Sequence, residues 1–115
     1  MDGFMTRKVE IAIIGAGTAG LSAYKEANKY TKDIVLIDNG PLGTTCARVG
    51  CMPSKILIHV ANQFYARKNF SGLGIKGAKQ LTVSISEVLA HVRKMRDTFT
   101  AGIITFMESL GDKFI

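Results

Sequence analysis

A strand-like apolar run, a glycine-rich turn and a helical pattern follow one another near the start of this chain. Residues 9–14 read VEIAII, a β-branched and mostly apolar run of the kind that forms buried parallel strands. Residues 18–29 then place Leu21 and Tyr24 at helical spacing with charged residues facing outward. Residues 34–37 read IVLI and predict a second strand. This order predicts an α/β fold in which two parallel strands are joined by a helical crossover, as in a βαβ unit.

The turn between the first strand and the helix has the spacing of a dinucleotide-binding loop. Residues 15–20 read GAGTAG, which fits G-x-G-x-x-G. Gly15 permits a tight turn, Gly17 lets the backbone approach a pyrophosphate, and Gly20 allows close packing of the helix on the strand. Asp38 ends the second strand and is placed to accept hydrogen bonds from a ribose hydroxyl. A glycine turn without a nucleotide is the alternative. The complete context favours a dinucleotide, and FAD and NAD are both open at this point.

Two cysteines follow a loop rich in turn-forming residues at positions 38–45. Cys46 and Cys51 are five residues apart, and in an ideal helix their Cα atoms would lie about 8.6 Å apart, too far for a disulfide. A bond between them requires a break in the helix, and Gly50 supplies the freedom for one. Cys51 would then lie near the start of a helix entered through Pro53, where the helix dipole stabilises a thiolate. Two unrelated buried cysteines are an equal alternative on spacing alone.

The second half of the chain is predicted to be mostly helical. An amphipathic helix covers residues 53–69, and residues 71–79, with three glycines, are expected to be irregular. Ser84 and Glu87 have capping-box spacing ahead of an apolar stripe at residues 88–110. The resulting helix would exceed twenty residues. A helix of that length would project beyond a small domain or pack on something outside the chain.

Length and composition limit the classes of function. A chain of 115 residues holds one ordinary domain, and its 47% hydrophobic and 21% charged residues exclude a disordered protein. The net charge of +6 is spread along the sequence in runs of no more than two, so we expect no nucleic-acid partner. No apolar run approaches the roughly twenty residues of a membrane span, and no secretory signal precedes the first strand. We therefore expect a cytoplasmic protein with no membrane partner.

The sequence around the two cysteines forms a longer motif that is more specific than the glycine loop. Residues 43–55 read GTTCARVGCMPSK, and together with residues 15–20 and Asp38 they resemble the FAD fingerprint and redox-disulfide segment of the pyridine nucleotide-disulfide oxidoreductases. The resemblance selects FAD, because the first G-x-G-x-x-G of this family binds FAD and a later one binds NAD or NADP. It implies that residues 9–115 are the N-terminal part of a Rossmann-like FAD-binding domain, preceded by an extension at residues 1–8.

The resemblance also implies roles for individual residues. Cys46 would be the interchange thiol that attacks a disulfide substrate. Cys51 would be the thiol beside the flavin, joined to Cys46 in a reversible disulfide when oxidised and forming a charge-transfer thiolate when reduced. The implied FAD-binding residues are Gly15, Gly17, Thr18, Ala19, Gly20, Asp38, Asn39, Thr45 and Lys55. Among them, Lys55 would lie near the reactive edge of the isoalloxazine ring.

The implied reaction passes electrons between NAD, the flavin, the cysteine pair and a small disulfide or dithiol substrate, with lipoamide favoured. A glutathione- or mercuric-reductase relative and a non-catalytic nucleotide-binding or redox-sensing module are the alternatives. Three departures from the family pattern bear on the substrate. Asp38 stands for the usual Glu, Thr44 for the usual second Gly, and Ala47 and Arg48 for the usual Leu or Val followed by Asn.

Members of the family are several times longer than this chain. The resemblance therefore covers only an N-terminal segment, without the NAD domain and the interface domain through which the parent would form a homodimer. We expect such a segment to bind FAD weakly and to be inactive alone. His59 and His91 do not match the family's acid–base motif, and they form no recognised metal-ligand spacing with the cysteines, so we expect no metal site.

Overall fold

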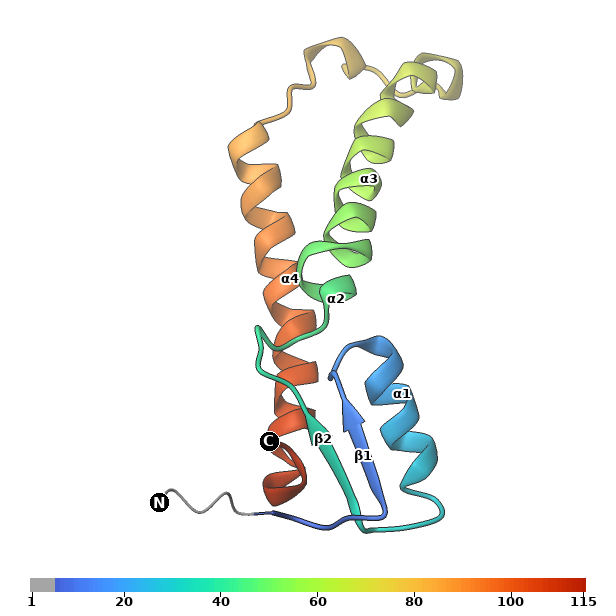
Figure 1. The fold of residues 1–115 in the computed structure, drawn as a ribbon. Coiled ribbons are helices and arrows are strands. Elements are labelled where there is room, and N and C mark those ends of the chain that lie inside the picture. The colour runs from blue at the N-terminus through green and yellow to red at the C-terminus, as the bar shows by residue number, and fades with distance from the viewer. Residues whose placement is uncertain (1–5) are drawn as a thin grey trace. The chain divides into compact units, whose positions relative to one another are not determined.

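The computed structural model describes residues 6–115, so most of the predicted extension at residues 1–8 lies outside the described residues (Figure 1). The chain divides into two compact units. We call Cys46–Thr100 the helix unit, and the described residues up to Thr45 together with Ala101–Ile115 the strand unit. The main elements are β1 (Ile11–Ile14), α1 (Thr18–Ala27), β2 (Ile34–Ile37), α2 (Thr45–Val49), α3 (Cys51–Ala66) and α4 (Ile85–Glu108). None of the described helices is long and apolar enough to cross a membrane.

The strand unit contains the predicted βαβ arrangement. β1 pairs with β2 in parallel, in a register that runs from Ile11 opposite Ile34 to Ile14 opposite Ile37, and α1 connects the two strands (Figure 1). The prediction of an α/β fold with parallel strands is therefore confirmed. β1 begins two residues later than predicted, because its ladder starts where β2 starts.

The core of the strand unit lies around β2. Ile34 and Leu36 of β2 are almost completely buried, and Met107 from the last turns of α4 is fully buried against them. Tyr24 of α1 is also buried and meets the Phe106 ring edge to face, with 6.4 Å between the ring centroids. Each large apolar side chain buried in this way contributes about 1.5–3 kcal/mol, so β2, α1 and the end of α4 hold one another in place.

A third chain segment pairs with the other edge of β2. The Ile115 amide donates to the Leu36 carbonyl and the Asp38 amide donates to the Ile115 carbonyl, both at 2.9 Å, and Phe114 bridges Leu36 in parallel. Sequence analysis did not predict this pairing. Among the described residues, β2 thus has a paired segment on each side, whereas β1 is paired only with β2. Ile14 at the end of β1 is 86% exposed.

The helix unit is built from α2, α3 and most of α4. α3 begins at Cys51, so Pro53 is its third residue and not its first, and α3 ends at Ala66 where a short 3-10 turn, Arg67–Asn69, continues the chain. Residues 71–79 are irregular apart from parts of two more such turns, Ser71–Leu73 and Ala78–Gln80.

α4 has 24 residues, as the predicted length of more than twenty requires. The Ser84 hydroxyl accepts from the Glu87 amide at 3.4 Å, which confirms one half of the predicted capping box. From Ala101 onward the residues of α4 belong to the strand unit, so both units use this helix.

Candidate functional site

The loop between β1 and α1 has the backbone geometry that its glycines predict. Gly15 has a φ of +101°, a conformation that residues with side chains rarely adopt. A Cβ atom on Gly20 would lie 1.7 Å from the Gly15 carbonyl oxygen, so only glycine lets α1 pack this close to the turn. A Cβ on Gly17 would meet nothing within 4 Å, which leaves open space over the middle of the loop.

The N-terminus of α1 is available to an anion. No side chain caps it, and no acidic residue lies in its first turn, where Thr18 and Ala19 are exposed. The first amides of a helix have no partner within the helix, and they carry the positive end of its dipole. An uncapped helix start behind an open glycine loop fits the pyrophosphate of a dinucleotide.

Asp38 ties this loop to the next one. Its carboxylate accepts from the Ala16 amide and from the Gly40 amide, each at 2.7 Å and each through a different oxygen. Asp38 therefore joins the β1–α1 loop to the loop after β2, a role that sequence analysis missed. Each carboxylate oxygen can accept a second hydrogen bond, so a contact with a ribose hydroxyl stays a prediction. The neighbouring Asn39 is exposed.

The turn before α2 has a backbone that favours the usual glycine at position 44 over the threonine that this chain carries. Thr44 is buried and has a φ of +64°, in the left-handed region that glycine adopts freely and threonine rarely does. The usual glycine at this position fits that backbone without strain. Thr45, the next residue, is the exposed first residue of α2.

The two cysteines lie on either side of a helix break. α2 ends at Val49, Gly50 leaves helical geometry with φ −122° and ψ −114°, and α3 begins at Cys51. The chain thus leaves helical geometry at Gly50, the departure that a bond between the cysteines would require, and the predicted position of Cys51 at a helix start is confirmed. Both cysteines are free thiols, with Cys46 half-buried and Cys51 exposed.

The two thiols have pKa values that differ in opposite directions from the usual value. Chiefly because the Cys46 thiol donates a hydrogen bond to the Cys51 sulfur, the pKa of Cys51 is lowered and the pKa of Cys46 is raised. The backbone amide of Cys51 and the positive charge of Lys55 lower the pKa of Cys51 further, against the opposing effect of burial. Burial and the neighbouring Cys51 charge raise the pKa of Cys46. Cys51 is therefore the thiol of the pair that loses its proton more readily.

The structure thus groups the predicted site residues in two sets. The glycine loop and Asp38 belong to the strand unit, and Cys46, Cys51 and Lys55 belong to the helix unit. His59 and His91 are exposed on α3 and α4. In residues 6–115, no three His, Cys, Asp or Glu side chains gather as metal ligands would.

Comparison with known proteins defines the class. The sequence profile described as pyridine nucleotide-disulphide oxidoreductase matches residues 9–109. The chain belongs to this family, and its strand unit is the start of a Rossmann-type FAD-binding fold.

Individual members of the family are similar to this chain over most of its length. The chain is 34% identical to dihydrolipoyl dehydrogenase of Buchnera aphidicola, over 86% of this chain and 21% of the relative. It is 30% identical to the Pseudomonas aeruginosa dihydrolipoyl dehydrogenase, over 90% of this chain and 23% of the relative. It is also 35% identical to mercuric reductase of Shigella flexneri, over 84% of this chain and 18% of the relative. The chain therefore spans about a fifth of the length of these relatives.

Proposed function

We propose that this chain is the FAD-binding and thiol-bearing segment of a flavoprotein disulfide oxidoreductase. The observation that carries the proposal is the position of Cys46 and Cys51 on either side of the helix break at Gly50, together with the lowered pKa of Cys51 and the raised pKa of Cys46. A low-pKa thiol with a second thiol in hydrogen-bond contact is the arrangement that thiol–disulfide exchange requires. Family membership supports the same reaction class.

The strand unit would hold the FAD. The amides at the start of α1 would bind its pyrophosphate across Gly17, and Asp38 and Asn39 would face the adenosine ribose. Thr45 and Lys55 would contact the remainder of the cofactor. When bound, the flavin supplies the electron pair that reduces the cysteine disulfide.

The two thiols would reduce a disulfide in balanced steps. Cys46 first passes its proton to Cys51 along their hydrogen bond, and the Cys46 thiolate attacks one substrate sulfur. The substrate S–S bond breaks, a mixed disulfide forms on Cys46, and the released thiolate takes the proton from Cys51. The Cys51 thiolate then attacks the Cys46 sulfur and releases the second substrate sulfur as a thiolate. The cysteines end as a disulfide, having given two electrons to the substrate.

For the whole protein we propose a cytoplasmic homodimer that uses NAD or NADP and acts on lipoamide. The dihydrolipoyl dehydrogenase relatives support lipoamide as the substrate. The present chain alone should bind FAD weakly and should not turn over, because other segments of the family cover the flavin ring. Leaving 100–150 Å² of the ring in water would cost roughly 2.5–4 kcal/mol, about two to three decades of affinity.

Thiol titration of the purified chain tests the proposal. The reduced chain should show two reactive thiols, and equilibration with oxidised lipoamide should remove both and release one dihydrolipoamide per chain. Two thiols that persist in the presence of excess oxidised lipoamide would contradict it. Calorimetry with FAD tests cofactor binding separately, and tight FAD binding with NADH-dependent turnover would show that the chain is self-sufficient.

Mercuric ion is a second candidate substrate, because a mercuric reductase is among the relatives at 35% identity. Any dithiol binds mercury, so binding alone does not separate the candidates. The rates at which disulfides oxidise the reduced chain separate the candidates. A rate with oxidised lipoamide at least tenfold higher than with oxidised glutathione favours the lipoamide assignment. Equal slow rates with both disulfides favour the mercuric relative.

A further inference from the structure

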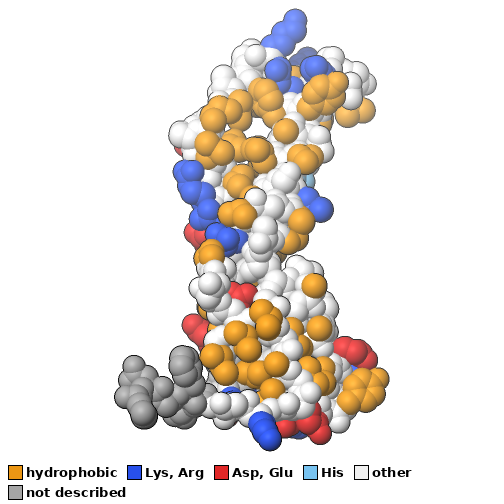
Figure 2. All heavy atoms as spheres, in the orientation of Figure 1, with side chains coloured by type: hydrophobic (Ala, Val, Ile, Leu, Met, Phe, Trp, Pro, Cys, Tyr) orange, Lys and Arg blue, Asp and Glu red, His pale blue; other side chains and the backbone are white. Residues whose placement is uncertain are grey.

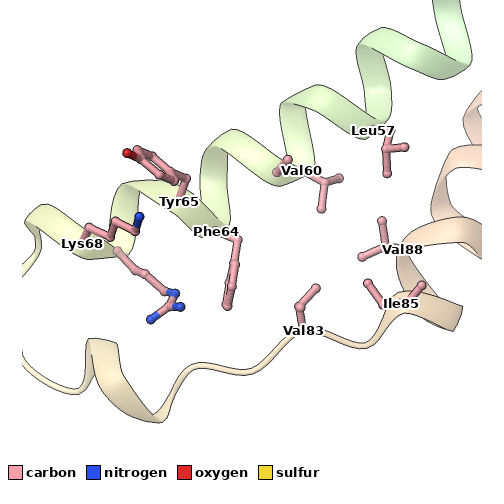
Figure 3. Close-up of a pocket in the computed structure, with 10 residues that line it drawn as sticks. Leu57, Val60, Phe64, Tyr65, Lys68, Val83, Ile85 and Val88 are labelled. Carbon is pink, nitrogen blue, oxygen red and sulfur yellow. The ribbon is translucent and has the colours of Figure 1, made fainter.

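A groove in the helix unit has no part in the proposed redox chemistry. It has a volume of about 310 Å³ and is lined mainly by apolar side chains of α3, the segment before α4 and the start of α4. Figure 3 shows side chains from the two sides pointing toward one another across it. They are Leu57, Val60 and Phe64 on α3 and Val83, Ile85 and Val88 opposite.

These apolar side chains are left partly in water. Ile85 is 64% exposed and Leu57 is 44% exposed, although both line the groove. Removing such surface from water is favourable, so the groove favours an occupant with an apolar body. The volume is that of roughly ten water molecules, and a methylene group occupies a similar space.

One end of the groove is positively charged. Arg67 lies 4.2 Å from the centre of the Phe64 ring, and the Lys68 ammonium lies 4.2 Å from the centre of the Tyr65 ring. Both basic residues line the groove, so their positive charges lie at one end of its apolar surface.

The charge of the whole helix unit points the same way. Its sequence holds nine Lys and Arg but only two acidic residues, Glu87 and Asp97, and Asp97 is paired with Arg96. The described residues of the strand unit hold six basic and six acidic residues, so the excess positive charge of the described chain lies in the helix unit. Among the residues that the structure describes, no acidic side chain lines the groove. Figure 2 shows hydrophobic and basic side chains together on the visible face of this unit.

We propose that this groove binds an amphipathic anion, namely an acyl chain of medium length that ends in a carboxylate. The acyl chain would lie along the apolar side chains of α3 and the start of α4. The carboxylate would accept from the terminal guanidinium nitrogens of Arg67 and from the Lys68 ammonium, because hydrogen bonds between charged groups are the strong ones. A neutral or cationic ligand of the same length would form no such charged hydrogen bonds.

Calorimetry with the full 115-residue chain and decanoate below its micelle concentration tests the proposal. Decanoate should bind saturably at one site, and decyltrimethylammonium should bind at least tenfold more weakly. The double variant Arg67→Gln and Lys68→Gln should weaken decanoate binding about tenfold. The matched control Lys76→Gln and Lys79→Gln removes two charges from the same unit outside the groove, and it should change the affinity less than twofold.

Three results would overturn the proposal. They are the absence of saturable decanoate binding, equal binding of the cationic analogue, and an equal loss of affinity in the two double variants. Circular dichroism of each variant separates loss of the site from loss of the fold. If the double variant unfolds, the single variant Lys68→Gln takes its place, and we expect it to weaken decanoate binding at least threefold.

Two further experiments test other occupants. Co-sedimentation with phosphatidylglycerol vesicles that the Arg67 and Lys68 changes abolish would contradict the proposal, because it would assign these residues to a lipid phosphate and not to a free carboxylate. Sedimentation velocity tests a second copy of the chain in the groove, and a dimer that decanoate does not dissociate would contradict the proposal.

Discussion

Six of the eight buried hydrophobic residues in the described chain belong to the strand unit, whereas the helix unit supplies only Ala47 and Val92. The exposed large hydrophobic residues show the opposite distribution, with three in the strand unit and eleven in the helix unit. The strand unit is thus packed around β2, and the helix unit leaves much of its apolar surface exposed.

The two units also position their chemistry by different means. In the strand unit, the conformation of the backbone determines the shape of the site. It does so through the positive φ of Gly15, the close approach at Gly20 and the amide that donates to Asp38. In the helix unit, electrostatics set the site, through one thiol hydrogen bond, the start of α3 and the charge of Lys55. A substitution in a site set by the backbone should therefore act through a steric clash. A substitution in a site set by electrostatics should shift a pKa by degrees.

The largest expected effect is that of Gly20→Ala. The new Cβ would lie 1.7 Å from the Gly15 carbonyl oxygen, so α1 must move away from the turn. We expect the free energy of unfolding to fall by about 4 kcal/mol or more, measured by urea denaturation. Gly17→Ala is the control, because its Cβ meets nothing, and it should change stability by less than about 1 kcal/mol. Equal effects of the two changes would contradict the assignment.

Leu36→Ala and Leu89→Ala compare packing in the two units with the same change of side chain. Leu36 is fully buried in the strand unit, and Leu89 is 40% exposed on α4 in the helix unit. Leu36→Ala should cost about 3 kcal/mol, and Leu89→Ala less than about 1 kcal/mol, by the same denaturation measurement. A larger loss at Leu89 would mean that the helix unit is more tightly packed than the strand unit.

Asp38→Asn tests the link between the two loops. The amide side chain keeps the shape but only one acceptor oxygen, so the Ala16 or the Gly40 amide loses its partner. We expect a loss of about 1–2 kcal/mol and faster hydrogen exchange at one of these amides. Asp33→Asn is the control, since Asp33 accepts from the Glu10 amide at an exposed position. Unchanged exchange at both Ala16 and Gly40 would rule out the link.

The smallest effects are expected at the thiols. Cys46→Ala removes the donor that contributes most to the lowered pKa of Cys51, so the pKa of Cys51 should rise and its thiolate fraction at pH 7 should fall. Alkylation of Cys51 by iodoacetamide at pH 7 should slow severalfold, and the midpoint of its pH–rate profile should move to higher pH. Lys55→Gln should shift the midpoint in the same direction but less. A profile that Cys46→Ala leaves unchanged would contradict the effect of Cys46 on the pKa of Cys51.

The sequence pattern was most informative where backbone chemistry leaves a residue signature. Residues 34–37 and the start of α1 were predicted without error, because an apolar run of strand length and a glycine motif each restrict the backbone strongly. The break at Gly50 followed from the distance that a disulfide requires. The first residue of α3 was wrong by two, because proline is tolerated throughout the first turn of a helix and does not mark its first residue.

Three features have no local pattern and were missed. The pairing of Phe114 and Ile115 with β2 involves too few residues to show strand periodicity. The contact of Asp38 with Ala16 joins a side chain to a backbone amide 22 positions away, and any residue type could supply that amide. Nothing in the sequence indicated the basic end of the groove, because Arg67 and Lys68 are two of many dispersed charged residues. The fold places both of them beside exposed apolar side chains.

The chain enters the helix unit from one segment of the strand unit and returns to another segment of it after Thr100. The pairing of Ile115 with Leu36 joins these two segments in one core. If the helix unit opens transiently, its two ends are still held at Thr45 and Ala101, so it behaves as a closed loop and not as a free tail. The entropy of such a loop depends only weakly on its length, and doubling the length costs about 0.6 kcal/mol. Insertions in the irregular stretch between α3 and α4 therefore have little thermodynamic effect on the strand unit, which leaves this stretch free to vary in length.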